Sequence, residues 1–221
     1  MRERLLIVGA GDFGREVLGW ALQVPPEKRT WEVGGFLDNR PHMLDDYNLP
    51  ASILGAPECH VYEAHDRVVV AIPDPVERRA MVQLLTNRGV QFTTLIHPSA
   101  TLGLNSTFGQ GCIICPNTHI TTGVKIGDHV IIDYHAGIGH DVQIGSYCTL
   151  SPGAGIMGGG ILEEGAGLGL FATLVPAAHI ETGAVVGAGS MVLKRVSAHT
   201  TVVGVPARKL LNRPAGGDRQ N

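Results

Sequence analysis

The sequence predicts a small α/β domain over residues 1–95, followed by a parallel β-helix of hexapeptide repeats over residues 96–207. Two observations support this prediction. Strand-like and helix-like segments alternate through the first part of the chain, and an apolar residue then recurs at every sixth position from Ile96 to Val192. The last segment, residues 208–221, is expected to be a flexible tail.

The first part of the chain has the alternating pattern of a parallel sheet covered by helices. Short apolar runs predict strands over residues 4–9, 31–37, 67–72 and 92–96. Helical spacing of apolar residues predicts helices over residues 15–23 and 75–88. In the second helix, Val76, Met81, Leu84 and Leu85 are expected to face inward. The domain has the length of about half of a complete dinucleotide-binding fold, so we expect a half-Rossmann-like unit.

A glycine-rich loop between the first strand and the first helix is the clearest chemical signal of this domain. Gly9 permits a tight turn, Gly11 lets a phosphate approach the backbone, and Gly14 allows close packing of the helix on the strand. The N-terminus of the following helix offers free N–H groups to an anion. Asp38 ends the next strand and is placed to accept hydrogen bonds from a ribose or base. We therefore expect nucleotide binding here; the alternative is a loop required only for packing.

The six-residue period matches neither an α-helix nor an ordinary strand, and it is typical of a solenoid in which three hexapeptides close one triangular coil. A small or β-branched residue stands two positions before many of the apolar ones, and Cys112 and Cys148 occupy this inward position. Cys112 and Cys115 form a C-x-x-C pair, but the repeat supplies no helix start or second ligand pair. The thiols are expected to be structural.

Composition narrows the function classes. The formal net charge of −3 gives no electrostatic basis for binding nucleic acid or an acidic membrane surface. No apolar run approaches the length of a membrane span, and no N-terminal leader is evident. A cytoplasmic protein without membrane insertion is expected.

Stacking of coils brings together residues that could catalyse acyl transfer. With roughly eighteen residues per coil, His140 lies beside Gly158 in the next coil. A histidine can accept a proton, and a glycine N–H can donate to an oxyanion. Asp141 could orient the ring, provided that the backbone bends between the two residues. Four other histidines are expected to be exposed at corners: His119, His129, His179 and His199.

Four motifs together resemble a known family. They are the N-terminal G-A-G-x-x-G-R-E-V unit, H-P-S-A, I-D-Y-H-A-G-I-G-H-D-V-x-I-G and the closing G-V-P-A-R. In combination they resemble the NeuD/PglD-type nucleotide-sugar acetyltransferases, which are left-handed β-helix hexapeptide-repeat enzymes. The resemblance implies a homotrimer that binds acetyl-CoA as acyl donor between protomers and holds a nucleotide-linked sugar in the N-terminal domain. It places the general base on His140, its acidic partner on Asp141 and the oxyanion donor on Gly158.

The same resemblance implies further contacts. Nucleotide-sugar contacts fall on Gly11, Asp12, Phe13, Asp38, Asn39 and Ile72. Coenzyme A contacts fall on Thr149, Leu170, Ala188 and Arg208, with Lys194 and Arg195 as further basic candidates for its phosphates. No metal is implied.

Three positions depart from the family pattern. Thr149 replaces a second histidine of some members, Pro73-Asp74 replaces a Gly-Asn pair and brings a charge near the sugar or phosphate, and Asp141 replaces a commoner glutamate. The expected activity is N-acetylation of a nucleotide-linked amino sugar. Alternatives are O-acetylation of a sugar or sialic acid, an NAD-binding protein and a non-catalytic scaffold trimer. A zinc carbonic-anhydrase-like enzyme using His135 and His140 lacks a third ligand.

Overall fold

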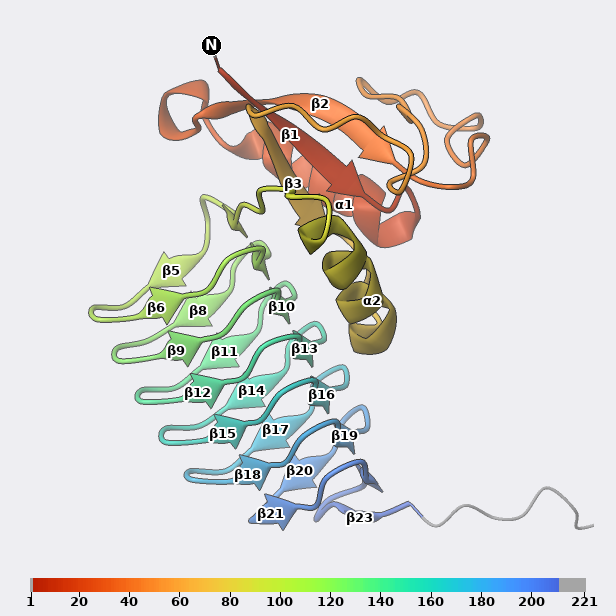
Figure 1. Cartoon of the computed structure of the whole chain (residues 1–221). Helices are drawn as coiled ribbons and strands as arrows, with labels where there is room; N and C mark the ends of the chain where they lie inside the picture. Colours follow the sequence, from red (N-terminus) through yellow and green to blue (C-terminus); the bar gives the residue numbers. More distant parts are fainter. Residues whose placement is uncertain (1, 211–221) are drawn as a thin grey trace, which may run out of the picture.

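The N-terminal domain lies on one end and one face of a long triangular solenoid in the computed structural model, which describes residues 2–210 (Figure 1). The sheet of the N-terminal domain consists of β1 (Glu3–Val8), β2 (Trp31–Leu37) and β3 (Asp66–Val70). The three strands are parallel in the order β2-β1-β3, with the apolar residues of β1 fully buried. The helical segments are α1 (Asp12–Gln23), a 3-10 turn η1 (Pro26–Lys28) and α2 (Pro75–Thr86). The prediction of a parallel α/β unit is confirmed.

The inward face of α2 differs from the prediction. Val76 is 76% exposed and Leu84 is also exposed, whereas Val82 and Leu85 are buried. Arg78 is 1% exposed and shares this buried face. The predicted inward face was therefore right for Leu85 and wrong for Val76 and Leu84. Part of the buried face is polar, because α2 also packs against backbone carbonyls of the solenoid, which Arg78 contacts.

The solenoid is a left-handed parallel β-helix with three faces, each a sheet that runs along its length (Figure 1). We call the faces B, C and D. Face B contains β4 (Leu95–Ile96), β7 (Ile113–Ile114), β10 (Ile131–Ile132), β13 (Thr149–Leu150), β16 (Gly167–Leu168), β19 (Val185–Val186), β22 (Thr201–Val203) and β23 (Arg208–Lys209). Face C contains β5 (Thr101–Leu102), β8 (His119–Ile120), β11 (Gly137–Ile138), β14 (Gly155–Ile156), β17 (Thr173–Leu174) and β20 (Met191–Val192). Face D contains β6 (Thr107–Phe108), β9 (Lys125–Ile126), β12 (Gln143–Ile144), β15 (Ile161–Leu162), β18 (His179–Ile180) and β21 (Arg195–Val196).

Each central coil repeats the one before it with a shift of eighteen residues, as Ile132 pairing with Leu150 shows. The second residue of most strands points inward, and the small residues two positions earlier complete the core, as the six-residue period predicts. Cys112 and Cys148 lie in this core. Burial raises the pKa of Cys112 to about 11 and that of Cys148 to about 12, so both thiols are protonated near neutral pH.

The two domains share a continuous apolar core. Leu5 and Ile7 of the sheet and Val17 of α1 belong to the same buried cluster as Ile113 and Ile131 of face B. Helix α2 runs beside the face B strands β10, β13 and β16 (Figure 1). The N-terminal domain thus covers face B of the first coils and is fixed to the solenoid by burial of apolar surface.

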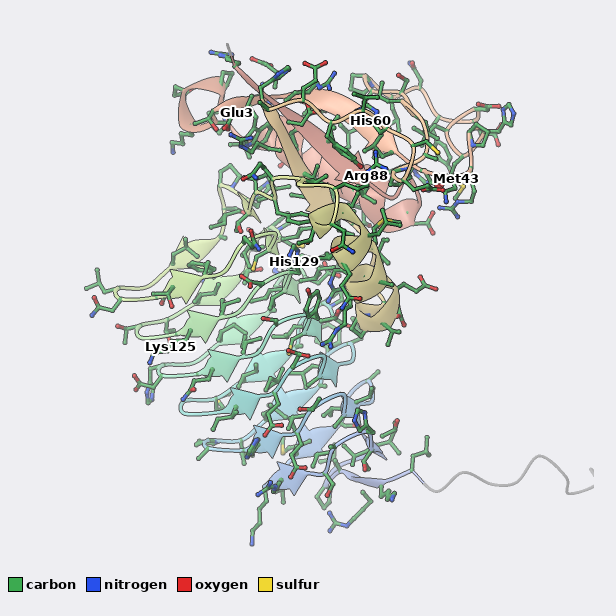
Figure 2. All side chains as sticks on the ribbon, in the orientation of Figure 1. Glu3, Met43, His60, Arg88, Lys125 and His129 are labelled. Carbon is green, nitrogen blue, oxygen red and sulfur yellow. The ribbon has the colours of Figure 1, made fainter. Side chains whose placement is uncertain are left out.

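The histidines depart from the expectation of exposed corner residues, since His119 and His179 lie in strands β8 and β18 and domain packing buries His129. His129 is only 2% exposed and lies between the solenoid and the N-terminal domain (Figure 2). Its ring stacks on Tyr147, with centroids 5.5 Å apart, and meets the edge of Phe92. Burial lowers the pKa of His129 to about 4. The prediction of an exposed corner histidine was wrong here because the repeat pattern carries no information about which corners another domain covers.

The end of the described chain is ordered. Arg208 and Lys209 form β23, which pairs antiparallel with β22, so regular structure continues into the segment predicted as a tail. Residues 211–221 lie outside the described residues. Within the described range, no helix has the length and apolar character needed to span a membrane.

Candidate active site

A cavity of about 600 Å³ opens at the carboxyl ends of the three parallel strands, where ligands of open α/β sheets bind. All six residues predicted to contact a nucleotide-linked sugar line it: Gly11, Asp12, Phe13, Asp38, Asn39 and Ile72. The close packing expected of Gly14 is present, since a Cβ there would lie 2.9 Å from the carbonyl carbon of Gly9. Gly11 serves as the N-cap of α1, and an added Cβ there would meet Arg40 Nη2 at 3.8 Å. In the described chain, no side chain caps this helix, so its first N–H groups face the cavity uncapped.

Asp38 has partners within the chain that the sequence did not reveal. Its carboxylate accepts hydrogen bonds from the Ala10 N–H at 2.8 Å and from the Arg40 guanidinium, with Nε and Nη2 at 2.9 and 2.8 Å. The Arg40 guanidinium and this backbone donor lower the pKa of Asp38 to about 2. Asp38 therefore holds Arg40 at the pocket wall, in addition to any contact it makes with a ligand.

The Pro73-Asp74 pair divides between two roles. Pro73 lines the cavity, while the Asp74 side chain caps α2 by accepting hydrogen bonds from Val76 N–H at 2.8 Å and Glu77 N–H at 2.9 Å. A carboxylate at this position satisfies free N–H groups of the first turn. The charge that we expected near a sugar or phosphate is thus used for helix capping.

His140, Asp141 and Gly158 meet at the corner between faces C and D. The Nδ1 atom of His140 lies 2.8 Å from Asp141 Oδ2. The opposite side of the ring lies over Gly158, where an added Cβ would come within 2.6 Å of Cε1 and would also meet Nε2. The Gly158 N–H has no hydrogen-bond acceptor among the residues of the described chain. The structure therefore brings a free imidazole nitrogen and a free backbone donor to one solvent-accessible point.

The bend that this arrangement requires occurs at Asp141. Its φ is 57°, in the left-handed region that aspartate tolerates better than most residues. The coils are tied together here, since the Gly159 N–H donates to the His140 carbonyl at 2.8 Å. The histidine and its acid are thus positioned by the corner itself.

The residues predicted to bind coenzyme A lie on other parts of the solenoid. Leu170 and Ala188 occupy neighbouring coils at the corner between faces B and C, where the Gly189 N–H donates to the Leu170 carbonyl. Arg208 lines a cavity of about 480 Å³ at the far end of the solenoid, together with Lys194 and Arg195. The Thr149 hydroxyl is engaged within the chain, because it donates to the Pro73 carbonyl at 2.9 Å. Coenzyme A binding by these residues stays a prediction.

One chain does not bring all the predicted groups together. The cavity at the glycine loop adjoins α1 and α2, which cover face B, whereas His140 lies in the loop between β11 and β12, at the edge of the solenoid away from α2 (Figure 1).

The reasoning from sequence did not assign Arg40, Pro57, Glu77 or Met81 to the cavity, although all four line it. The sequence feature that could have identified Arg40 is its position two residues after Asp38, the acid at the end of the predicted second strand.

Comparisons with known proteins agree with this geometry. A family model described as the PglD N-terminal domain matches residues 4–85, and one described as a bacterial transferase hexapeptide (six repeats) matches residues 123–158. GDP-perosamine N-acetyltransferase of Escherichia coli O157:H7 is 34% identical over 154 residues, which are 66% of this chain and 68% of that enzyme. Serine acetyltransferase of Escherichia coli (strain K12) is 34% identical over 135 residues, but these are 59% of this chain and only 43% of that enzyme.

Two solved structures match nearly the whole chain. WeeI from Acinetobacter baumannii AYE has a TM-score of 0.81 and 29% identity, covering 94% of this chain and 100% of its own. PerB from Caulobacter crescentus, in complex with CoA and GDP-perosamine, has a TM-score of 0.84 and 26% identity, covering 93% and 96%. Fold and site define a hexapeptide-repeat acyltransferase with a cavity at the glycine loop of its N-terminal domain. The chain belongs to the family of PglD-type sugar N-acetyltransferases.

Proposed function

We propose that the protein transfers the acetyl group of acetyl-CoA to the amine of a sugar linked to a nucleoside diphosphate. The observation that carries this proposal is the placement of the His140 ring between Asp141 and the free N–H of Gly158. The family relationship supports the sugar, since the relative from Escherichia coli is named as a GDP-perosamine N-acetyltransferase, and the complex of PerB with CoA supports the acyl donor.

The geometry defines the role of each group. Asp141 accepts the Nδ1–H of His140, which leaves Nε2 as a proton acceptor for the attacking amine. As nitrogen bonds to the thioester carbonyl carbon, the carbonyl oxygen gains charge, and the Gly158 N–H donates to it. The C–S bond then breaks and coenzyme A leaves with a proton. No covalent enzyme intermediate is required, and the Cys112 and Cys148 thiols are buried in the core.

The nucleotide occupies the cavity at the glycine loop. Its phosphates bind the uncapped N-terminus of α1, because free N–H groups and the helix dipole favour an anion there. Asp38, Asn39 and Arg40 supply polar contacts at the end of β2.

The active site is formed between copies of the chain in a homotrimer. This follows from the position of His140 at the edge of the solenoid away from α2, while the nucleotide cavity lies on the side that α2 covers (Figure 1). In a cyclic trimer the corner of one copy can face the cavity of the next. Mass measurement by light scattering checks the trimer; a monomer with full activity contradicts it.

Mixed trimers test the shared site directly. His140→Ala removes the base and Gly11→Asp blocks the cavity, so each variant alone is expected to be inactive. If cavity and base come from different copies, random mixing of the two variants restores about one quarter of the sites. No recovery after subunit exchange would show that both groups must come from one copy.

The substrate is identified by assaying acetyl transfer from acetyl-CoA to UDP-, GDP- and dTDP-linked amino sugars. Turnover is measured by the release of free thiol. An N-acetyl product resists hydroxylamine, whereas an O-acetyl ester is cleaved by it. Thermal shift with NAD is the control for a nicotinamide-binding protein. Absence of turnover with every amino sugar, despite binding, would refute the proposed activity.

A further inference from the structure

Arg78 carries a buried charge that the proposed reaction does not use. Its side chain lies on the inner face of α2 beside Val82 and Leu85 and is 1% exposed. No carboxylate of the described residues forms a salt bridge with it. Burial lowers the pKa of Arg78 to about 10, so the guanidinium keeps its charge near neutral pH.

The guanidinium is held by six uncharged acceptors from three segments. Nε donates to the His129 carbonyl at 2.9 Å. Nη1 donates to the carbonyls of Ile72 and Pro73 at 2.7 and 2.9 Å. Nη2 lies 2.7 Å from the Tyr147 carbonyl, 3.1 Å from the Cys148 carbonyl and 3.0 Å from the Thr149 hydroxyl. Arginine satisfies such a set because its donors form a rigid planar fork.

Filling space does not explain an arginine at this position. Removing a charge from water is costly, and an apolar residue such as Val82 or Leu85 would in turn leave the buried carbonyls that Arg78 contacts without a donor. What arginine adds is a fixed geometry among the backbone segments that it joins.

Those segments belong to the two halves of the active site. Ile72 and Pro73 line the nucleotide cavity. Thr149 belongs to β13, which follows β11, the His140 loop and β12 in the same coil. The Thr149 hydroxyl receives a hydrogen bond from Arg78 and donates one to Pro73, so the cavity wall is joined to this coil twice.

We propose that Arg78 is a positioning residue. It fixes the nucleotide cavity at the same level along the solenoid axis as the coil that carries His140. This inference rests on the proposed function and its trimer. Around a threefold axis parallel to the solenoid, equivalent coils lie at one height. Fixing the cavity to its own coil through Thr149 therefore also fixes it relative to His140 of the neighbouring copy.

The principal test is Arg78→Met, which keeps the volume but removes the fork. Misplacement by about 1 Å can lower turnover by about 10²-fold, so we expect a fall of that size in kcat. The Kd values for acetyl-CoA and nucleotide-sugar, measured by calorimetry, should change by less than about threefold, because the residues that contact the ligands remain. The melting temperature is expected to fall, because buried carbonyls lose a donor, so kcat is measured well below the unfolding transition.

Three further variants separate positioning from charge and from packing. Arg78→Lys restores the charge without the fork, and its kcat should stay close to that of Arg78→Met. Thr149→Val removes one of the two connections and should cause a smaller fall. Arg79→Gln is the matched control, because Arg79 is the neighbouring arginine of α2 and contacts the solenoid only through Glu164 and the Tyr147 ring among the side chains of the described residues; its kcat should equal that of the wild type.

Hydrogen exchange provides a readout that does not require turnover. The peptide spanning residues 71–77 should exchange faster in Arg78→Met and Arg78→Lys, but not in Arg79→Gln. Unchanged exchange, a kcat within about threefold of the wild type, or a loss of affinity in parallel with kcat would each overturn the proposal. A wild-type protein without acetyl transfer would instead refute the proposed function, and exchange would still test the connection between cavity and coil.

Discussion

In a Gly158→Ala variant, the added methyl group would lie in the space that the His140 ring occupies. The added Cβ would lie 2.6 Å from Cε1 and 2.9 Å from Cδ2 of the ring, whereas ordinary contact begins near 3.4 Å. The ring must therefore move by roughly 1 Å, a displacement that can cost about 10²-fold in rate. The imidazole is two-thirds exposed and can turn outward, so the fold should remain stable.

The assay is acetyl transfer at saturating concentrations of both substrates, with a thermal melt and a crystal structure of the variant. We expect a fall in kcat of about 10²-fold, an unchanged melting temperature and a displaced ring. Gly19→Ala is the control, since Gly19 lies in α1 with open space around it. A displaced ring with kcat within about threefold of the wild type would refute the assignment of His140 as the positioned base.

Three other results are expected. His140→Ala should lower kcat by roughly 10²–10⁴-fold with little change in stability, and Asp141→Asn should lower it less; more than about a tenth of wild-type kcat in the alanine variant would show that another group takes the proton. Gly11→Asp should abolish nucleotide-sugar binding, because its carboxylate would project into the cavity next to Arg40, while acetyl-CoA binding measured by calorimetry persists; equal loss of both ligands would contradict two separate sites. Stability should fall as the pH drops from 6.5 to 4, by up to about 3 kcal/mol, because unfolded His129 takes up a proton in this range and the buried folded ring does not.

Denaturant unfolding at pH 7 and pH 4.5 measures that last effect. Two charged neighbours act on His129 in opposite directions, since Asp128 raises its pKa and Arg78 lowers it, and burial is the dominant cause. His129→Asn removes the titration while tolerating the left-handed backbone at this corner, where φ is 54°. The difference between the pH dependences of the two proteins isolates His129, and identical dependences would contradict its buried neutral state.

The repeat, the place of the cavity and the meeting of His140 with Gly158 could be predicted because each depends on local spacing. The six-residue period fixes which residues enter the solenoid core, and the eighteen-residue coil places His140 beside Gly158 without knowledge of any other element. The glycine loop likewise identifies the end of the sheet at which the cavity opens. The capping role of Asp74 could also be predicted from the sequence, since an acid before proline, with glutamate three residues later, is a helix-start pattern.

Burial of Arg78 and His129 could not be predicted in this way. Both side chains lie where α2 meets the solenoid, and their contacts join residues far apart in the chain. An arginine in a helical segment is ordinarily exposed, and a histidine at a solenoid corner ordinarily faces water. Only the docking of one domain on the other reverses both expectations.

The separation of these contacts in sequence has a consequence for the order of folding. Neighbouring coils join residues eighteen positions apart, so closing each coil on the last requires only a short loop. The Arg78 hydrogen bonds to the solenoid span 51 to 71 residues. Contacts of such long range form slowly compared with local ones. We expect the coils to assemble one upon another first, and the nucleotide cavity to reach its final place only when α2 closes onto β13.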